Sequence, residues 1–309
     1  MLKYTVKRIL LVIPILFGVI FIVFSIMSLT PGDPGRLMLG INAKQEAVDA
    51  LNHQLGYDQP FFVRLFKYTG DLLHGDLGTS YRTTTSFTDD LLVRLPVTFR
   101  VGFISMIISG IIGISLGILA AIKQFTVWDS FTSAMALIFA SVPSFFIGLA
   151  MVLYFGVHLH WLPTTGVSDW TGYIMPIITL TLGSVASIMR FTRTAMLEAV
   201  NQDYIRTARA KGCTEKKVIW KHAFKNALIP IITLLGTHFG TILGGSIIVE
   251  NVFNLPGIGQ YVLTAIRSKD IPIVLSSTVV LAAFFCVVMI VVDLLYAAVD
   301  PRVRERYHK

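Results

Sequence analysis

The chain has 309 residues, of which 54% are hydrophobic and 14% charged, and its mean hydropathy of +0.70 excludes an ordinary water-soluble globule. The formal net charge of +8 does not indicate a nucleic-acid-binding protein, because the basic residues gather at the ends of apolar segments rather than on one exposed face. The two cysteines, Cys213 and Cys286, are too far apart in sequence to indicate a disulfide framework or a metal-ligand pattern.

Six apolar stretches are long enough to cross a hydrocarbon core of about 30 Å, which takes roughly 20 helical residues. They lie near residues 9–29, 97–122, 131–157, 173–192, 229–249 and 274–298. The first follows a basic N-terminus as in a signal peptide, but its apolar run is too long and lacks a small-residue cleavage site, so we expect a retained span. Prolines such as Pro143 are tolerated within spans, because neighbouring helices satisfy the freed carbonyls, and we expect kinks or early-turn positions at them. The sequence therefore predicts an all-α polytopic membrane protein with six transmembrane helices.

The distribution of Lys and Arg predicts the orientation of these spans. Segments expected on the inside carry 17 of the 26 basic residues, whereas the short outside segments carry none at 158–172 and two at 251–273. Both termini are therefore expected to be cytoplasmic. The sequence therefore predicts an N-terminal tail and first span at 1–29, followed by an extracytoplasmic segment at 30–96. A core of five spans is expected at 95–297, with a cytoplasmic basic loop at 193–228, and a cytoplasmic tail is expected at 298–309.

The extracytoplasmic segment has the features of a small folded cap. It contains PGDP at Pro31–Pro34 and HGDLGTS at His74–Ser80, with an amphipathic region around Gln45–Leu73 between them. Its acidic and basic residues nearly balance, so no strong electrostatic field is expected. Its polar residues form either a solvated surface or a substrate site.

Glycines recur at helical spacing in two of the spans. The second span carries Gly113 and Gly117, and the fifth carries Gly236, Gly240 and Gly244. Glycine faces let another helix backbone approach closely, so these two helices are expected in the tightly packed interior. Such smooth faces serve fixed packing, or they allow helices to slide between states.

The fifth span also holds the candidates for a substrate path, His238 and Ser246. An ionisable residue within a span is a functional-site hypothesis, although a neutral imidazole bonded to another helix is the simpler alternative for His238. His158 and His160 form a pair at an outer helix end, but two imidazoles without further ligands make a weak metal site, so no metal is expected.

The basic loop contains two helical segments separated by a turn. The first, Asp203 to Lys211, is expected to stop at Gly212 in the left-handed conformation, and Thr214 can cap the second. In the second, lysines recur every four residues from Lys217 beside an apolar arc, which is typical of an amphipathic helix at a membrane interface. Its lysines either reach lipid headgroups or, with the basic residues of the first segment, contact a partner protein.

No catalytic motif is present in the sequence. It has no Gly-x-x-x-x-Gly-Lys-Ser/Thr phosphate loop, no His-Glu-x-x-His and no Gly-x-Ser-x-Gly, so the chain is not expected to be an enzyme or to hydrolyse ATP. Two other classes stay open as alternatives: an intramembrane enzyme, for which His238 would be the first candidate, and a channel.

Several landmarks run nearly end to end along the chain. Besides PGDP and HGDLGTS, they are Trp161–Gly166, Asp203–Gly212, His222, Asn226–Ala227, Asn254–Gln260 and Asp300–Arg302. In these motifs the chain resembles a permease subunit of the bacterial dipeptide/oligopeptide/nickel class of ATP-binding-cassette (ABC) importers. The resemblance implies the type I importer permease fold.

The resemblance also assigns the basic loop to coupling with an ATPase. The expected coupling residues are Asp203, Tyr204, Arg206, Thr207, Ala208, Arg209, Ala210, Lys211 and Gly212. In the broader superfamily the loop motif starts Glu-Ala-Ala and later ends in a proline. Here Arg206-Thr207-Ala208 stands at the start and Lys225 takes the place of the proline, so the docking chemistry is expected to differ in detail from that of sugar importers.

The partners implied by the resemblance are a homologous second permease, two cytoplasmic ATPase subunits that use ATP and Mg²⁺, and an extracytoplasmic solute-binding protein, in addition to membrane lipid. No cofactor is expected on this chain. The implied substrate is a small peptide, with nickel, a nickel chelate or a glutathione-like solute as the alternative, and the implied location is the bacterial cell membrane.

Overall fold

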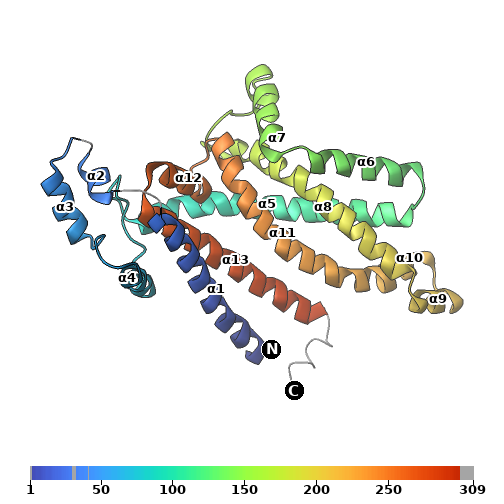
Figure 1. Ribbon diagram of the computed structural model, residues 1–309. Helices are drawn as coiled ribbons and strands as arrows, with labels where there is room; N and C mark the ends of the chain where they lie inside the picture. The colour runs from blue at the N-terminus through green and yellow to red at the C-terminus, as the bar shows by residue number, and fades with distance from the viewer. Residues whose placement is uncertain (1, 30–32, 41, 300–309) are drawn as a thin grey trace. The chain divides into compact units, whose positions relative to one another are not determined.

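In the part that the computed structural model describes, residues 2–29, 33–40 and 42–299, the protein consists of helices joined by turns and loops, with one isolated antiparallel bridge between Thr79 and Ser86 (Figure 1). The long helices are α1 (Leu2–Leu29), α5 (Phe87–Ile122), α8 (Ile174–Val200), α11 (Phe224–Val252) and α13 (Ile271–Val299). By length and composition, 5 helical stretches among the described residues can cross a membrane, or 6 if one bent pair counts as a span. The prediction of an all-α chain with this many candidate spans is confirmed.

The predicted third span, 131–157, is not one straight helix. It is split into α6 (Val127–Ser141) and α7 (Ser144–Met151), which continues as the π-helix η1 (Val152–His158), and the two parts are bent by 92°. Pro143 stands at the N-cap of α7, and Val142 before it has an extended backbone with ψ 123°. A proline disfavours the helical conformation in the preceding residue, so the helix ends there instead of passing through with a kink.

The chain forms two compact units. The first contains Phe99–Leu255 and the part of α13 from Val287 onward, and the second contains Val6–Thr98 and Pro256–Cys286. In the first unit, buried side chains of α8 and α11 pack with those of the basic loop, and α5, α6 and α8 meet through small residues. This unit holds most of the residues that the sequence singles out.

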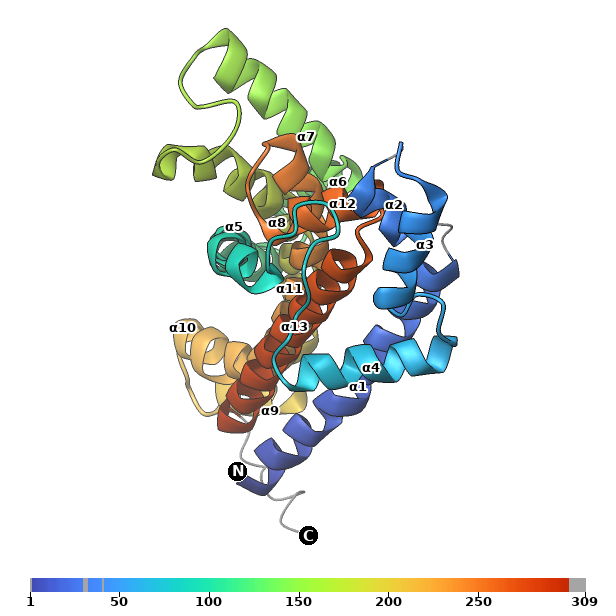
Figure 2. The same ribbon diagram turned by 90° about the vertical axis from the view of Figure 1, so that its left-hand side faces the viewer.

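In the second unit, the predicted amphipathic region 45–73 consists of two helices, α3 (Gln45–Gln54) and α4 (Phe61–Leu73), which are preceded by the short α2 (Pro34–Leu39). Figure 2 shows α4 lying across α1. Leu65 of α4 is buried in a cluster with Ile20 and Phe24 of α1. The sequence did not predict the remaining helix of this unit, α12 (Ile258–Ser268), which lies within an expected outside segment.

Candidate coupling site

The short helix α9 (Asp203–Ala210) follows α8 after two residues and is held by its apolar face. Ile205 is 0% exposed and Ala208 is 7% exposed, and residues three apart lie on the same face of a helix. They pack in one cluster with Met196 and Ala199 near the C-terminal end of α8 and with Val218 after the turn. The orientation of α9 is thus fixed by α8 and by the helix that follows it.

The opposite face of α9 is polar and open. The predicted coupling residues that are exposed are Asp203, Tyr204, Arg206, Thr207, Arg209, Ala210, Lys211 and Gly212. Ala208, which the resemblance includes in the same set, belongs to the buried cluster instead. The structure therefore brings these residues together on α9, seen in Figure 1, and on the turn that follows it, with one buried side and one exposed side.

The C-terminal end of α9 is closed by a left-handed turn, as the sequence predicts. Gly212 has φ +76° and donates its N–H to the Arg209 carbonyl at 2.9 Å, while Cys213 N–H bonds the Ala208 carbonyl at 3.2 Å. This pair of bonds is the Schellman arrangement. Thr214 is the N-cap residue of α10 (Glu215–Lys217), as expected, but its side chain makes no capping bond.

An ion pair crosses the turn. Arg209 Nε lies 2.8 Å from Glu215 Oε1, and Nη2 lies 3.3 Å from Oε2. The hydrogen bond to Glu215 raises the pKa of the Arg209 guanidinium above its ordinary value. Arg209 is therefore engaged within the basic loop, and Arg206 lies 3.7 Å from the Asp203 carboxylate on the same helix, so both basic side chains have acidic neighbours on the exposed side of α9.

The second helical segment of the basic loop is continuous with the fifth span. α10 leads through the π-helix η3 (Val218–Ala223) into α11, and the run from Glu215 to Val252 counts as one candidate span. Lys217, Lys221 and Lys225 are exposed, whereas Ala223 and Ala227 are buried, which agrees with the predicted amphipathic pattern.

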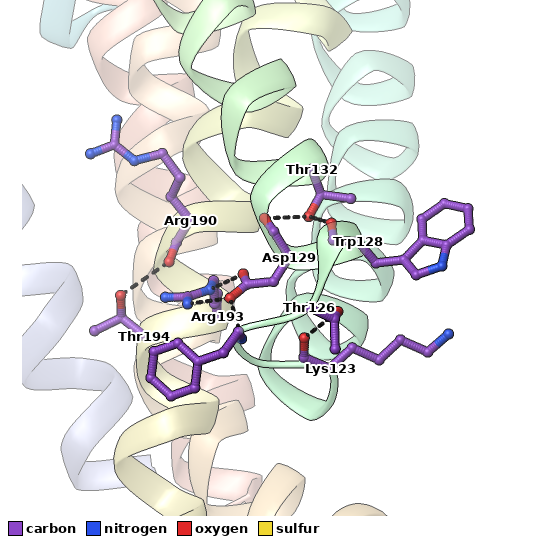
Figure 3. Close-up of polar contacts among 9 residues, drawn as sticks. Lys123, Thr126, Trp128, Asp129, Thr132, Arg190, Arg193 and Thr194 are labelled. Atoms are coloured by element: carbon purple, nitrogen blue, oxygen red, sulfur yellow. Dashed lines mark hydrogen bonds and ion pairs between the residues drawn. The ribbon is translucent and has the colours of Figure 1, made fainter.

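A second ion pair, which the sequence did not predict, lies in the same unit (Figure 3). Asp129 in the first turn of α6 accepts two hydrogen bonds from Arg193 of α8, at 2.7 Å from Nε and 2.8 Å from Nη2. The predicted basic loop starts at residue 193, but α8 in fact continues to Val200 and Arg193 is helical. The signal that could have found the pair is that Asp129 is the one acidic residue between Asp90 and Asp169.

The glycines of the second span lie against α8. A β-carbon at Gly113 would stand 2.8 Å from the Ile188 side chain, and one at Gly117 would stand 2.7 Å from the Met189 carbonyl oxygen. On α11, a β-carbon at Gly236 would stand 2.8 Å from the Val292 side chain of α13. These close contacts join α5 to α8 and α11 to α13.

The remaining glycines of the fifth span differ from Gly236. Gly240 is partly buried, and Gly244 is exposed with no heavy atom within 4 Å of its β-carbon position in the described chain.

The two candidates for a substrate path occupy different environments. Ser246 is 0% exposed, and its hydroxyl donates to the Leu243 carbonyl of its own helix at 2.8 Å. His238 is partly buried, and its Nε2 atom has no hydrogen-bond partner among the described residues. Within the same residues, no three His, Cys, Asp or Glu side chains come together as metal ligands would.

The expected cap holds a cavity of about 230 Å³ within the second unit. Arg64 lies in its wall and bonds the Tyr57 carbonyl at 3.0 Å and the Ser28 hydroxyl at 2.8 Å. Burial raises the pKa of Tyr68 to about 12, and burial together with the charge of Asp270 raises that of Tyr81 to about 12. Tyr68 and Tyr81 therefore keep their phenolic protons to a higher pH than an ordinary tyrosine does.

Comparisons with known proteins agree with this architecture. Residues 113–305 match the family described as binding-protein-dependent transport system inner membrane component, and residues 1–102 match the N-terminal family of the same transport systems. The glutathione transport system permease protein GsiC of Escherichia coli K12 is 38% identical over 304 residues, which is 98% of this chain and 99% of that protein. GsiC of Salmonella paratyphi A is 40% identical over 306 residues, with the same coverage of 98% and 99%.

Solved structures show the same fold at lower identity. The MetNI methionine ABC transporter, in an inward facing conformation, matches with a TM-score of 0.56 and 20% identity, covering 69% of this chain and 98% of that chain. An amino acid ABC transporter with histidines matches with a TM-score of 0.52 and 16% identity, covering 70% and 95%.

Proposed function

The chain belongs to the family of inner membrane components of binding-protein-dependent transport systems, as a multi-pass permease subunit of an ABC importer, and from that premise we propose that it imports small peptides of glutathione-like size. The observation that carries the substrate class is the 38% identity to glutathione permeases over 98% of the chain. Glutathione is itself a short peptide, so this similarity favours peptides over nickel.

We further propose that the open face of α9 docks a cytoplasmic ATPase subunit. This docking proposal is supported by the contrast between the buried Ile205 and the exposed Arg206 and Lys211, which gives the helix one buried and one exposed side. The complete importer then contains a second permease, two ATPase subunits that bind ATP and Mg²⁺, and a solute-binding protein. ATP binding shifts the equilibrium between the two conformations of the permease pair, and the difference in nucleotide affinity between these conformations limits the size of the shift.

Uptake by proteoliposomes tests the substrate. The complex is reconstituted with its binding protein and supplied with glutathione, with dipeptides or with a Ni²⁺ chelate. We expect ATP-dependent accumulation of glutathione or short peptides. Uptake of the nickel chelate alone would overturn the peptide assignment, and solute flux through this chain without ATPase subunits would indicate a channel.

The topology is tested by thiol labelling in a Cys213→Ser background. An impermeant maleimide added to intact cells should label an Asp58→Cys variant and spare an Arg206→Cys variant, and inside-out vesicles should give the reverse. Both side chains are well exposed, with 52% and 79% of their surface accessible, so a difference in labelling reports sidedness rather than burial. Labelling of position 206 from outside would overturn the cytoplasmic assignment of α9.

A further inference from the structure

The Asp129–Arg193 pair is much less exposed than the Arg209–Glu215 pair of the basic loop. The Asp129 side chain is 8% exposed and that of Arg193 is 26% exposed, whereas Arg209 and Glu215 are 42% and 62% exposed. Both carboxylate oxygens accept from the guanidinium, which is the bidentate arrangement that fixes direction as well as distance. The pair joins residues 64 positions apart, so it connects two helices rather than two turns of one.

The same carboxylate also holds the turn that leads into α6. The Phe125 N–H donates to Asp129 Oδ2 at 3.1 Å, and Phe125 has the left-handed φ of +63° that non-glycine residues rarely adopt. Figure 3 shows the Asp129 carboxylate between this turn and Arg193, while the side chains of Lys123 and Arg190 point away from it. One side chain thus fixes the start of α6 and its attachment to α8.

Packing around the pair leaves little room for α6 and α8 to slide past each other. Ala136 of α6, Ala186 and Met189 of α8, and Ala120 of α5 are buried in one cluster. Beside this cluster, a β-carbon at Gly117 would stand 2.6 Å from Thr192 of α8. Closely packed interfaces of this kind move as a block or change between discrete arrangements rather than deforming gradually.

The pair also lies close to α9 along the chain. Arg193 is two helical turns before the end of α8 at Val200, a distance of about 10 Å along the axis. The last turn of α8 shares its buried cluster with Ile205 and Ala208 of α9. A force applied to α9 therefore reaches Arg193 through continuous helix and buried contacts.

We propose that the Asp129–Arg193 pair is a positioning pair, which makes the first turn of α6 move together with α8 and α9 and stays closed throughout the transport cycle. This inference rests on the proposed coupling role of α9. In this role the pair touches neither solute nor nucleotide. It acts by transmitting the displacement of α8 to α6.

The first test separates coupling from stability. Asp129→Asn and Asp129→Glu variants are compared with Arg190→Gln, which removes a charge from the exposed face of α8 one turn before Arg193. We expect Asp129→Asn to retain assembled complex and ATPase activity but to transport roughly ten-fold less solute per ATP, a loss of about 1.4 kcal/mol in coupling. Asp129→Glu should recover part of the ratio, and Arg190→Gln should leave it unchanged.

The outcomes distinguish this inference from the function on which it rests. If transport and ATPase activity of Asp129→Asn fall in proportion, the pair is only structural and the inference is wrong. If Asp129→Asn lowers the amount of complex, the ratio is measured in the exchanged variant Asp129→Arg with Arg193→Asp, where recovery supports the inference and a low ratio overturns it. If the unaltered complex shows no solute-stimulated ATPase activity, the proposed function itself fails.

A second test asks whether the pair opens. Asp129→Cys and Arg193→Cys are combined in a Cys213→Ser and Cys286→Ser background and joined by a short reducible bis-thiosulfonate reagent. Transport that persists after cross-linking supports a pair that stays closed. Transport that stops after cross-linking and returns on reduction overturns it, because α6 and α8 must then separate in the cycle.

Discussion

The turn at Gly212 allows a graded test of the coupling role of α9. Gly212 has φ +76°, and apart from its two chain neighbours no described residue has a heavy atom within 4 Å of the place where a β-carbon would stand. A side chain at this position therefore meets open space, and its cost comes from the backbone conformation alone. That cost is about 1 to 2 kcal/mol for a residue with a β-carbon, is greatest for a β-branched one and is smaller for Asn.

The strength of the turn sets how far each substitution can disturb it. Two backbone hydrogen bonds, from Gly212 and Cys213, close the end of α9 and contribute about 1 kcal/mol each. The Arg209–Glu215 pair adds little, because both side chains are exposed. A backbone cost of about 1 kcal/mol should leave the turn mostly formed in Gly212→Ala, and a cost of about 2 kcal/mol should nearly cancel the hydrogen bonds in Gly212→Val.

Transport per ATP hydrolysed, measured in proteoliposomes, should therefore fall in the order parent, Gly212→Asn, Gly212→Ala, Gly212→Val. The assembled complex should keep its melting temperature, because Gly212 is exposed and contributes no buried contact. Equal ratios in the parent and Gly212→Val would refute the reasoning. A loss of complex that follows the same order would also refute it, since the turn would then serve assembly rather than coupling.

Three further predictions concern packing, charge and pH. Gly117→Ala should lower the melting temperature in detergent by a cost of about 1 to 3 kcal/mol, because its β-carbon would meet the Met189 carbonyl at 2.7 Å, whereas Gly183→Ala has open space and should not. Arg209→Glu or Glu215→Arg alone places like charges across the turn and should slightly reduce solute transported per ATP, and the combined exchange should restore it; equal ratios in the single variants and the exchange would show that the ion pair has no part in orienting α9. Tyr81, with its pKa raised to about 12 from an ordinary 10.0, should stay protonated at a pH where exposed tyrosines ionise. The stability that the protonated Tyr81 adds is therefore complete below pH 10 and is lost as the pH rises towards 12. Ultraviolet titration of the phenolate signal against a Tyr81→Phe variant checks this, and an unchanged late-titrating signal would contradict it.

Features with a local cause could be predicted from the sequence. The long helices follow from apolar length, and the left-handed turn follows from a glycine placed just after a helical segment. The sequence predicted a kink or an early turn at Pro143 but not a break with a 92° bend between α6 and α7, although the cause of the break is also local. Pro143 allows either a kinked span or a broken one, and which occurs depends on whether neighbouring helices satisfy the freed backbone groups.

The Asp129–Arg193 pair could not be predicted in the same way. Its two residues are 64 positions apart, and the sequence offers several basic residues as partners for the acidic one. The choice depends on which residues of α6 and α8 face each other once Ala136 and Ala186 pack together. Small buried residues set the separation of the helices, and the ion pair forms where the charged side chains then meet.

The glycines of the fifth span show why a regular spacing does not identify a contact. A step of four residues advances an α-helix by about 400°, so each successive glycine is turned by about 40° from the one before. From Gly236 to Gly244 the direction has rotated by about 80°, so the two glycines face different surroundings. A β-carbon at Gly236 would therefore stand 2.8 Å from Val292, while one at Gly244 would meet no neighbouring atom within 4 Å in the described chain. A glycine stripe predicts that close approach is possible along a helix, but the direction of each residue decides where it occurs.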